Sequence, residues 1–410
     1  MASQKEVTPS NEDADHTVRV GSVALVVLCQ STQALIYGGI ALFLPLIQKD
    51  LGLSFTQAGT LAAASTIVYA LMQIPSGHLA DRAGGKPMFL IGLLGTNLLA
   101  FSFAHLDHYG MLLANQALSG GFRSLLFAPG LMLMSALFPA ERRATAMGLY
   151  VAGGFSSNVL LNTLGPSLVG PLGWRVLFMI FSAGGVIALL SYWRFGAPGP
   201  RGSRTEPLSL AEILSLFRSP LMWVIGAIQY VRLAIVSGLS FWLPTFLVVE
   251  KGYSLQMAGL LVAIGSAVTA PANFLGGYVS DRLRSPLLVV GGSLTLLALM
   301  NILLVHVTSL WLLVGVFVVN GIFVQFYFGP LFAVQIQMMG RQRAGLTAGC
   351  GNFFANLGSL SCAYCLGVLK DATGSFTIGL YGLAGLCLFA LVCTIALSRM
   401  KPIEPAPSLK

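Results

Sequence analysis

The sequence predicts an all-α membrane protein with 12 transmembrane helices in two pseudo-symmetric six-helix bundles. Its composition suits a chain folded in lipid, because 56% of the residues are hydrophobic and only 9% are charged. The 410 residues divide into apolar runs of about 20 residues or more, each long enough to cross a bilayer as a helix. Charged residues of one polar gap recur in the second half of the chain, which indicates a duplicated unit.

Six predicted spans form the first bundle, residues 20–194. They are Val20–Leu46, Thr56–Ala80, Pro87–Leu106, Tyr109–Phe138, Arg143–Val169 and Trp174–Trp193. The second bundle, residues 220–398, holds Pro220–Val249, Ser254–Val279, Pro286–Val305, Leu310–Met339, Gly345–Leu369 and Phe376–Leu397. The alternating pattern of barrel strands is absent, and the 47 glycines suit close contacts between helices.

Polar segments flank the bundles. Residues 1–19 and 399–410 are predicted tails, and the Pro/Gly/Arg-rich residues 195–219 are a predicted cytoplasmic linker. Of the 23 lysines and arginines, 17 lie in the tails and in the connections on that same side. The positive-inside rule therefore places both termini in the cytoplasm. We expect a multi-pass protein embedded in a lipid bilayer, the bacterial inner (plasma) membrane. Because this topology accounts for the net charge of +9, we expect no nucleic-acid partner.

The duplication shows in residues about 200 positions apart. Gly77, Asp81 and Arg82 recur as Gly277, Asp281 and Arg282, each set in a short polar gap between two apolar runs. Further pairs with nearly the same offset are Pro45 with Pro244, Pro129 with Pro330, and Arg143 with Arg343. Parallel duplication of a six-helix unit is typical of transporters, whose substrate site lies near the midplane between the halves.

The first copy of the polar gap reads GHLADRAGGK. It resembles the conserved loop of the major facilitator superfamily, G-x-L-x-D-R-x-G-x-K, through Gly77, Leu79, Asp81, Arg82, Gly84 and Lys86, and it departs at Gly85. The second copy carries Arg284 where the glycine is expected. The resemblance covers the whole chain and implies a secondary transporter that works by alternating access. It implies no cofactor, no metal site and no enzymatic activity, and we expect a monomer.

Two arginines lie well inside predicted spans, Arg123 and Arg232, whereas all 14 acidic residues lie in tails, loops or span ends. A charge at bilayer depth costs at least about 2.5–3.5 kcal/mol, so it usually faces water or a partner. A guanidinium suits carboxylate, sulfonate or phosphate. We therefore expect both arginines to contact a small anionic substrate, with a structural brace to backbone carbonyls as the alternative for each.

Uncharged polar residues at helical spacing complete the predicted substrate site. They are Gln30, Gln33 and Tyr37 in the first span, Asn158 and Asn162 in the fifth, Gln229 and Tyr230 in the seventh, Gln325 and Tyr327 in the tenth, and Asn352 and Asn356 in the eleventh. The alternative for each is a hydrogen bond between helices, because amides in lipid need partners.

The seventh span is similar to that of the anion:cation symporter branch of the superfamily, with Arg232 twelve residues before Pro244 in a run that ends GLSFWLPTFLVVEKGYS. The fourth span is also similar to that branch, through the runs FAPG and LFPAERRATAMGL. The resemblance implies transport of a mono- or dicarboxylate or similar anion, by symport with H+ or Na+ or by anion exchange. Two departures leave the coupling ion open: Asn115–Gln116 replaces an early basic residue, and Ser124 stands where a carboxylate is common.

In the superfamily, the conserved loop latches the cytoplasmic face closed. The resemblance therefore implies a conformational latch made of Gly77, Asp81, Arg82, Gly84, Glu141, Arg142, Asp281, Arg282 and Arg341. The alternative is that these charges only hold the loops inside.

Two other functions compete with anion transport. Gly165-Pro166 partly resembles the antiporter motif of drug and metabolite efflux pumps, but Leu161 breaks its glycine spacing. A remote alternative is an intramembrane enzyme or receptor, which the absence of HExxH and GxSxG disfavours.

Overall fold

A computed structural model describes residues 11–138, 143–199, 215–339 and 344–401. The first half of the chain forms α1 (Asn11–Leu51), α2 (Phe55–Ala83), α3 (Gly85–Phe103), α4 (Tyr109–Leu137) and α5 (Arg143–Phe195). The second half begins with a seventh span built from α7 (Pro220–Leu233), η2 (Ala234–Leu239), α8 (Ser240–Thr245) and η3 (Phe246–Glu250). It continues through α9 (Leu255–Ala267), α10 (Thr269–Leu283), α11 (Pro286–His306), α12 (Leu310–Phe326), α13 (Phe328–Met339), α14 (Ala344–Thr373) and α15 (Thr377–Arg399).

The described helices account for the twelve predicted spans. Eleven stretches are long and apolar enough to cross a membrane. One of them belongs to α5, which contains the predicted fifth and sixth spans and is interrupted at Gly173, where φ is +78°. Because glycine adopts a positive φ without steric cost, Gly173 allows the chain to turn back between these two spans. The eighth and tenth spans are each built from two helices, α9 with α10 and α12 with α13.

The first helix is longer than the apolar run that predicts it. It begins at Asn11, within the predicted tail of residues 1–19, while its membrane-spanning stretch begins at Val20. Residues 200–214 of the predicted linker lie outside the described residues.

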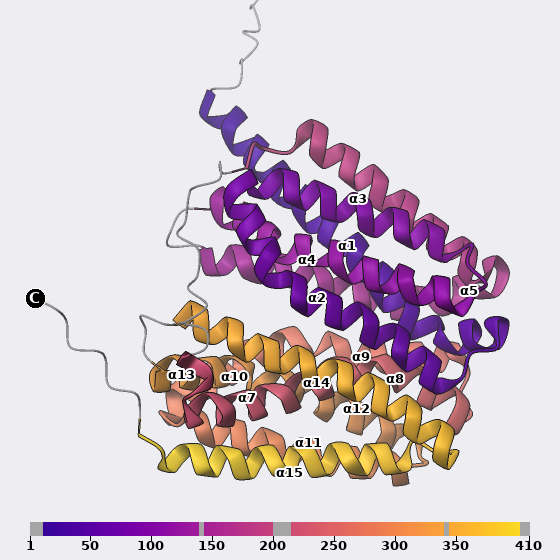
Figure 1. The fold of residues 1–410 in the computed structure, drawn as a ribbon, viewed down its shortest axis with the longest axis vertical. Coiled ribbons are helices and arrows are strands. Elements are labelled where there is room, and N and C mark those ends of the chain that lie inside the picture. The colour runs from indigo at the N-terminus through magenta and orange to yellow at the C-terminus, as the bar shows by residue number, and fades with distance from the viewer. Residues whose placement is uncertain (1–10, 139–142, 200–214, 340–343, 402–410) are drawn as a thin grey trace, which may run out of the picture.

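The two halves form two bundles, one above the other in Figure 1. We call the end where α5 and α15 finish the tail end, and the end with residues 51–55, 306–310 and 373–377 the far end. The halves meet along α2 with α14, α5 with α9, and α1 with α8. In Figure 1, α2 and α14 lie together at the far end and diverge toward the tail end.

A carboxylate joins the halves at the far end. Asp371, in the last turn of α14, accepts hydrogen bonds from the backbone N–H groups of Phe55 at 3.1 Å and Thr56 at 2.6 Å. These are the first residues of α2, whose next free N–H, that of Gln57, is capped by the Ser54 hydroxyl. Asp371 from the second half therefore completes the capping of a helix in the first half.

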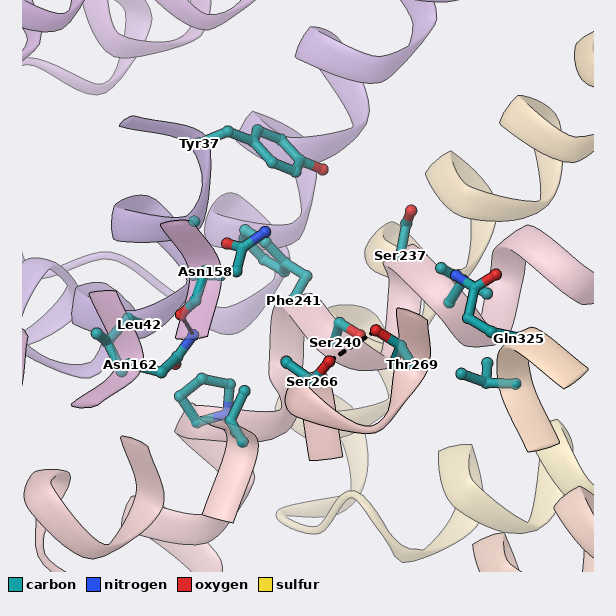
Figure 2. A pocket seen from close by; sticks show the side chains of 16 residues that line it. Tyr37, Leu42, Asn158, Asn162, Ser237, Ser240, Phe241, Ser266, Thr269 and Gln325 are labelled. Atoms are coloured by element: carbon teal, nitrogen blue, oxygen red, sulfur yellow. Dashed lines mark hydrogen bonds between the residues drawn. The ribbon is translucent and has the colours of Figure 1, made fainter. Parts of the chain in front are cut away.

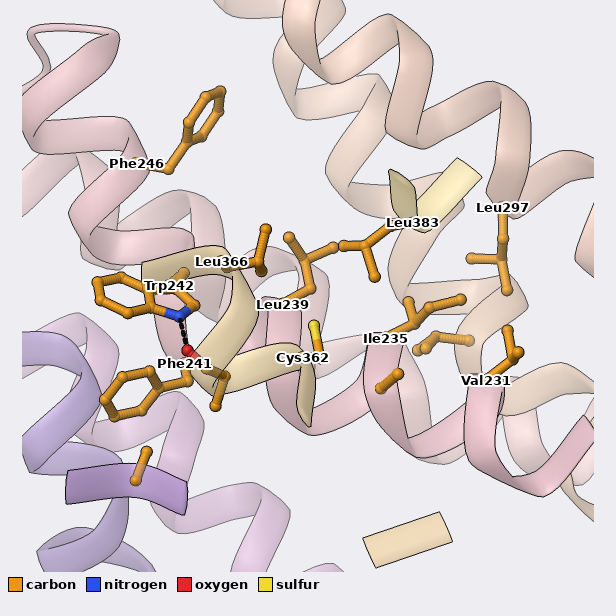
Figure 3. Packing of buried hydrophobic residues seen from close by; sticks show 14 of the residues in the cluster. Val231, Ile235, Leu239, Phe241, Trp242, Phe246, Leu297, Cys362, Leu366 and Leu383 are labelled. Carbon is orange, nitrogen blue, oxygen red and sulfur yellow. Dashed lines mark hydrogen bonds between the residues drawn. The ribbon is translucent and has the colours of Figure 1, made fainter. Parts of the chain in front are cut away.

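Aromatic packing surrounds this contact. The ring of Phe55 lies 6.0 Å from that of Trp242 and 5.9 Å from that of Phe376, both in the second half. Trp242 Nε1 donates to the carbonyl of Ala363 at 2.8 Å, within the cluster of buried side chains in Figure 3. Gly367 on α14 lies against the carbonyl of Phe55, so a larger residue there would force the two helices apart. These contacts hold the halves together at the far end.

Candidate functional site

Two cavities lie between the halves, and both are lined by Tyr37 and Ser237. The arginine cavity, about 230 Å³, lies toward the tail end and is lined by Tyr37, Thr66, Tyr69, Gln73, Arg123, Phe127, Leu233, Ser237, Asn352, Asn356 and Ser359. The hydroxyl cavity, about 240 Å³, reaches toward the far end. Its polar lining residues are Tyr37, Asn158, Asn162, Ser237, Ser240, Ser266, Thr269 and Gln325. Figure 2 shows residues of the first half facing residues of the second across this space.

Arg123 on α4 is the charged residue in the lining of the arginine cavity. Its guanidinium carbon lies 3.9 Å from the centroid of the Tyr37 ring and 5.1 Å from that of Tyr69. One Nη donates to the Ser65 hydroxyl at 3.3 Å, while Nε is buried and has no partner among the described residues. Because a guanidinium carries five N–H donors, most of the hydrogen-bonding capacity of Arg123 is free for a ligand.

Among the described residues, no charged side chain lines the hydroxyl cavity. Asn162 donates to the carbonyl of Asn158 at 2.8 Å, and Thr269 donates to the carbonyl of Ser266 at 2.6 Å. The side chains of Ser237, Ser240, Ser266 and Gln325 make no hydrogen bond to another described residue, so they too are free for a ligand.

Irregular backbone brings these groups to the cavity. Ser237 lies in η2, a π-helical turn between α7 and α8. Thr269 opens α10, directly after the break at Val268, and Gln325 precedes the break at Tyr327 between α12 and α13. In membrane proteins, such interruptions are tolerated where they line a water-filled cavity or are buried in protein, and π-helical turns are frequent at functional sites.

The structure brings seven of the predicted site residues together around these cavities. They are Arg123, Tyr37, Asn158, Asn162, Gln325, Asn352 and Asn356. Asn352 on α14 also donates to the Gln73 side chain of α2 at 2.6 Å, which links the two halves at the arginine cavity.

Arg232 is not in the lining of either cavity. It is 5% exposed, its Nε donates to Gln229 Oε1 at 2.8 Å, and its guanidinium carbon lies 5.0 Å from the centroid of the Phe328 ring. Gln229 Nε2 donates in turn to Gln335 Oε1 at 3.1 Å, and Gln335 donates to the carbonyl of Thr347. Arg232 thus belongs to a polar chain that connects α7, α13 and α14 inside the second half. Its predicted contact with substrate stays a prediction.

Four other predicted site residues also lie outside the lining of the two cavities. Gln30 Oε1 lies 2.8 Å from the hydroxyl of Tyr150, and the hydroxyl of Tyr230 lies 2.5 Å from that of Ser361. Gln33 is buried, and so is Tyr327, whose hydroxyl has no partner among the described residues.

Part of the predicted latch lies outside the described residues. Glu141, Arg142 and Arg341 are outside the described residues, as is the side chain of Asp81. Arg82, Asp281 and Arg282 are exposed and form no ion pair with another described residue. Gly77 has open space around its Cβ position, and Gly84, with φ at +90°, separates α2 from α3. The latch stays a prediction.

Sequence reasoning missed several residues of the site. Tyr69 and Gln73 have the i, i+4 spacing that places two side chains on one helix face, and this signal was available in the second predicted span. Ser237, Ser240, Ser266 and Thr269 carry no such signal, because serine and threonine occur throughout membrane helices and often bond to their own backbone. Among the described residues, no group of three or more His, Cys, Asp or Glu could hold a metal ion.

Comparison with known proteins supplies the family. Residues 26–363 match the profile of the Major Facilitator Superfamily, with a second match over residues 254–408. The chain belongs to this superfamily. The predicted fold class and family are thereby confirmed, and membership of a transporter superfamily confirms the choice of a transporter over an intramembrane enzyme.

Curated relatives are similar to the chain at low identity. It is 28% identical over 248 residues to the "Probable nitrate/nitrite antiporter NarK1" of Thermus thermophilus, a match that spans 58% of this chain and 55% of that protein. It is 23% identical over 404 residues to the "Probable galactarate/D-glucarate transporter GudP" of Escherichia coli K12, spanning 87% and 89%. A D-galactonate transporter of Escherichia coli O6:H1 is 25% identical over 267 residues, spanning 58% and 61%.

A solved structure shares the fold. A bacterial homologue of the human lysosomal transporter Spinster, captured inward-facing and unoccupied, superimposes with a TM-score of 0.80 at 18% sequence identity. That comparison covers 97% of this chain and 100% of the other.

Proposed function

We propose that this protein is a secondary transporter that moves a small organic anion across the membrane by alternating access, with the anion held by Arg123. The observation that carries the proposal is a guanidinium that faces a cavity between the halves with most of its N–H donors free. The part of the chain that the structure describes places no aspartate or glutamate in the lining of either cavity. An anion is therefore the ligand that would neutralise Arg123 at bilayer depth.

The two tyrosines beside Arg123 support this assignment. The faces of Tyr37 and Tyr69 hold the guanidinium by cation–π attraction and leave its N–H edges for an acceptor. A planar fork held in this way suits a carboxylate, which can accept two parallel hydrogen bonds. The names of the relatives, which include transporters of galactarate, D-galactonate and nitrate, support a small anion as the cargo.

Alternating access requires contacts between the halves that can break. In the described residues the contacts of α2 with α14 extend from Asp371 at the far end to Gln73 and Asn352 at the arginine cavity. We propose that the tail end faces the cytoplasm, in keeping with the positive-inside rule, and that opening to the other side breaks the far-end contacts.

The coupling of transport follows from the same linings. Since no carboxylate of the described residues lines either cavity, we propose that a coupled proton enters bound to the anion, or that one anion exchanges for another. We also propose that the chain acts as a monomer in the bacterial inner membrane.

Uptake by purified protein in proteoliposomes tests this proposal. We expect saturable counterflow of D-galactonate that Arg123→Ala abolishes and Arg123→Lys retains in part, because lysine keeps the charge and loses the fork. The matched control is Arg399→Ala, at the exposed end of α15, which should transport normally. Full transport by Arg123→Ala, or transport of lipophilic cations in place of anions, would show the proposal to be wrong. The same assay on Arg232→Ala tests the predicted contact of that arginine with substrate, and an imposed pH gradient distinguishes proton symport from exchange.

A further inference from the structure

The two cavities differ in the charge that they can accept. Of the described residues, Arg123 is the one cation in the lining of the arginine cavity, and none lines the hydroxyl cavity that adjoins it at Tyr37 and Ser237. A ligand that spans both would place one carboxylate on Arg123 and its other end among Ser240, Ser266 and Gln325. That other end would be buried between the halves with no positive partner among the described residues.

Burial without a cation disfavours a second carboxylate in the hydroxyl cavity. An ionised group removed from water needs an opposite charge to offset its desolvation, and hydroxyl and amide donors offset only part of that cost. Hydroxyl groups have no such requirement, because each can donate to one partner and accept from another. The uncommitted hydroxyls of Ser237, Ser240 and Ser266 and the amide of Gln325 supply both kinds of partner.

The remaining walls of the hydroxyl cavity are apolar. The lining also includes Val236, Phe241, Val262 and Val324, so a ligand there meets hydrogen-bonding side chains and hydrocarbon together. A polyhydroxylated carbon chain matches this lining, since it carries hydroxyls and C–H groups along the same backbone. A purely aliphatic tail would fill the space and leave the four polar side chains without partners, which costs affinity.

From this lining we propose that the substrate is a monocarboxylate with an uncharged, hydroxylated tail. The lack of a cation in the hydroxyl cavity selects that tail over a second carboxylate, and Ser240 and Gln325 select it over an aliphatic tail. The inference rests on the proposed function, because it takes the carboxylate of the same substrate to be bound at Arg123. It goes further in separating hydroxylated monoanions from dianions and from aliphatic acids of similar length.

Equilibrium binding to the purified full-length protein, by calorimetry, tests the proposal with three probes. D-galactonate and galactarate share a carbon skeleton and differ at one end, where a hydroxymethyl group replaces a carboxylate, and hexanoate has the same length without hydroxyls. We expect D-galactonate to bind at least tenfold more tightly than either of the others. The double variant Ser240→Ala with Gln325→Leu should bring the D-galactonate to hexanoate affinity ratio toward one, and Arg399→Ala should retain the wild-type ratio.

A gain of binding makes the test independent of any loss of folding. Gln325→Lys places a cation in the hydroxyl cavity, and we expect it to reverse the preference so that galactarate binds more tightly than D-galactonate. Wild-type protein that binds galactarate as tightly as D-galactonate would overturn the inference, as would a Gln325→Lys variant with unchanged preference. If all three anions bind in an Arg123-dependent way without discrimination, only the inference fails. If none binds, or if Arg123→Ala binds all three normally, the proposed function fails with it.

Discussion

Replacement of Asp371 by asparagine should shift the transporter toward the state in which its halves separate at the far end. The Asp371 carboxylate accepts the N–H groups of both Phe55 and Thr56, at 3.1 and 2.6 Å, and it belongs to the opposite half. Asparagine has a single acceptor oxygen and no charge. It would therefore lose one of the two hydrogen bonds and the attraction between a negative charge and the N-terminus of α2.

The size of the shift follows from these two losses. One hydrogen bond contributes about 1 kcal/mol net, and a charge at an exposed helix terminus contributes about 0.3–1 kcal/mol. Asp371 is exposed, so solvent and salt screen the second contribution. The sum of about 1–2 kcal/mol corresponds to a change of roughly 5- to 30-fold in the ratio of the two states.

Distance measurements between spin labels on the two halves would detect this change. Labels at Lys49 in the first half and Thr308 in the second, both exposed at the far end, report its opening in proteoliposomes after the native cysteines are replaced. The matched control is Asp107→Asn, which removes an exposed charge at the same end whose partner, Arg175, lies in its own half. Identical distance distributions for Asp371→Asn and the unsubstituted chain would refute the reasoning, and so would an equal shift caused by Asp107→Asn.

Two further predictions concern stability. Arg284 ends α10 at φ +49°, a left-handed conformation that costs an L-residue about 1–2 kcal/mol, so Arg284→Gly should raise the thermal unfolding temperature, whereas Arg282→Gly in the last turn of the helix should lower it. Equal effects of the two changes would contradict this explanation. Gln335→Leu should lower the unfolding temperature, since it leaves Gln229 Nε2 without this partner inside the second half, at about 1–3 kcal/mol. The exposed Gln256→Leu is its control, and an unchanged unfolding temperature for Gln335→Leu would show that the polar chain adds no stability.

The comparison of α10 with α2 shows how far a sequence repeat predicts structure. Gly84 and Arg284 occupy equivalent places after the two copies of the charged loop, and both adopt a positive φ. The repeat therefore extends to the sign of φ at this position, although an arginine side chain disfavours a positive φ. Glycine meets this requirement without steric cost and arginine does not, so the second copy carries local strain that the aligned motifs alone would not reveal.

The predicted site was partly correct for a physical reason. Helical spacing identified Tyr37, Asn158 and Asn352, since a polar residue in an apolar span must face a partner or a cavity. The same rule selected Gln229 and Arg232, which satisfy their polar groups by bonding to each other inside one half. The sequence does not distinguish a polar residue that faces a cavity from one that bonds to another side chain, because the two cases differ only in how neighbouring helices pack.

The class of the protein, its twelve spans, its duplication and the scarcity of acids at bilayer depth could all be predicted from the amino-acid sequence. These are properties of composition and of distance along the chain, and the bilayer converts them directly into helices. The tertiary structure was needed to show that Arg123 lies against two tyrosines at the arginine cavity. It was also needed to show that uncommitted hydroxyls from η2, α8 and α9 line the hydroxyl cavity, and that Asp371 caps a helix of the other half. Each of these features depends on how the helices are rotated, interrupted and packed together. Contacts between residues far apart in the sequence set this arrangement, so local sequence patterns do not predict it.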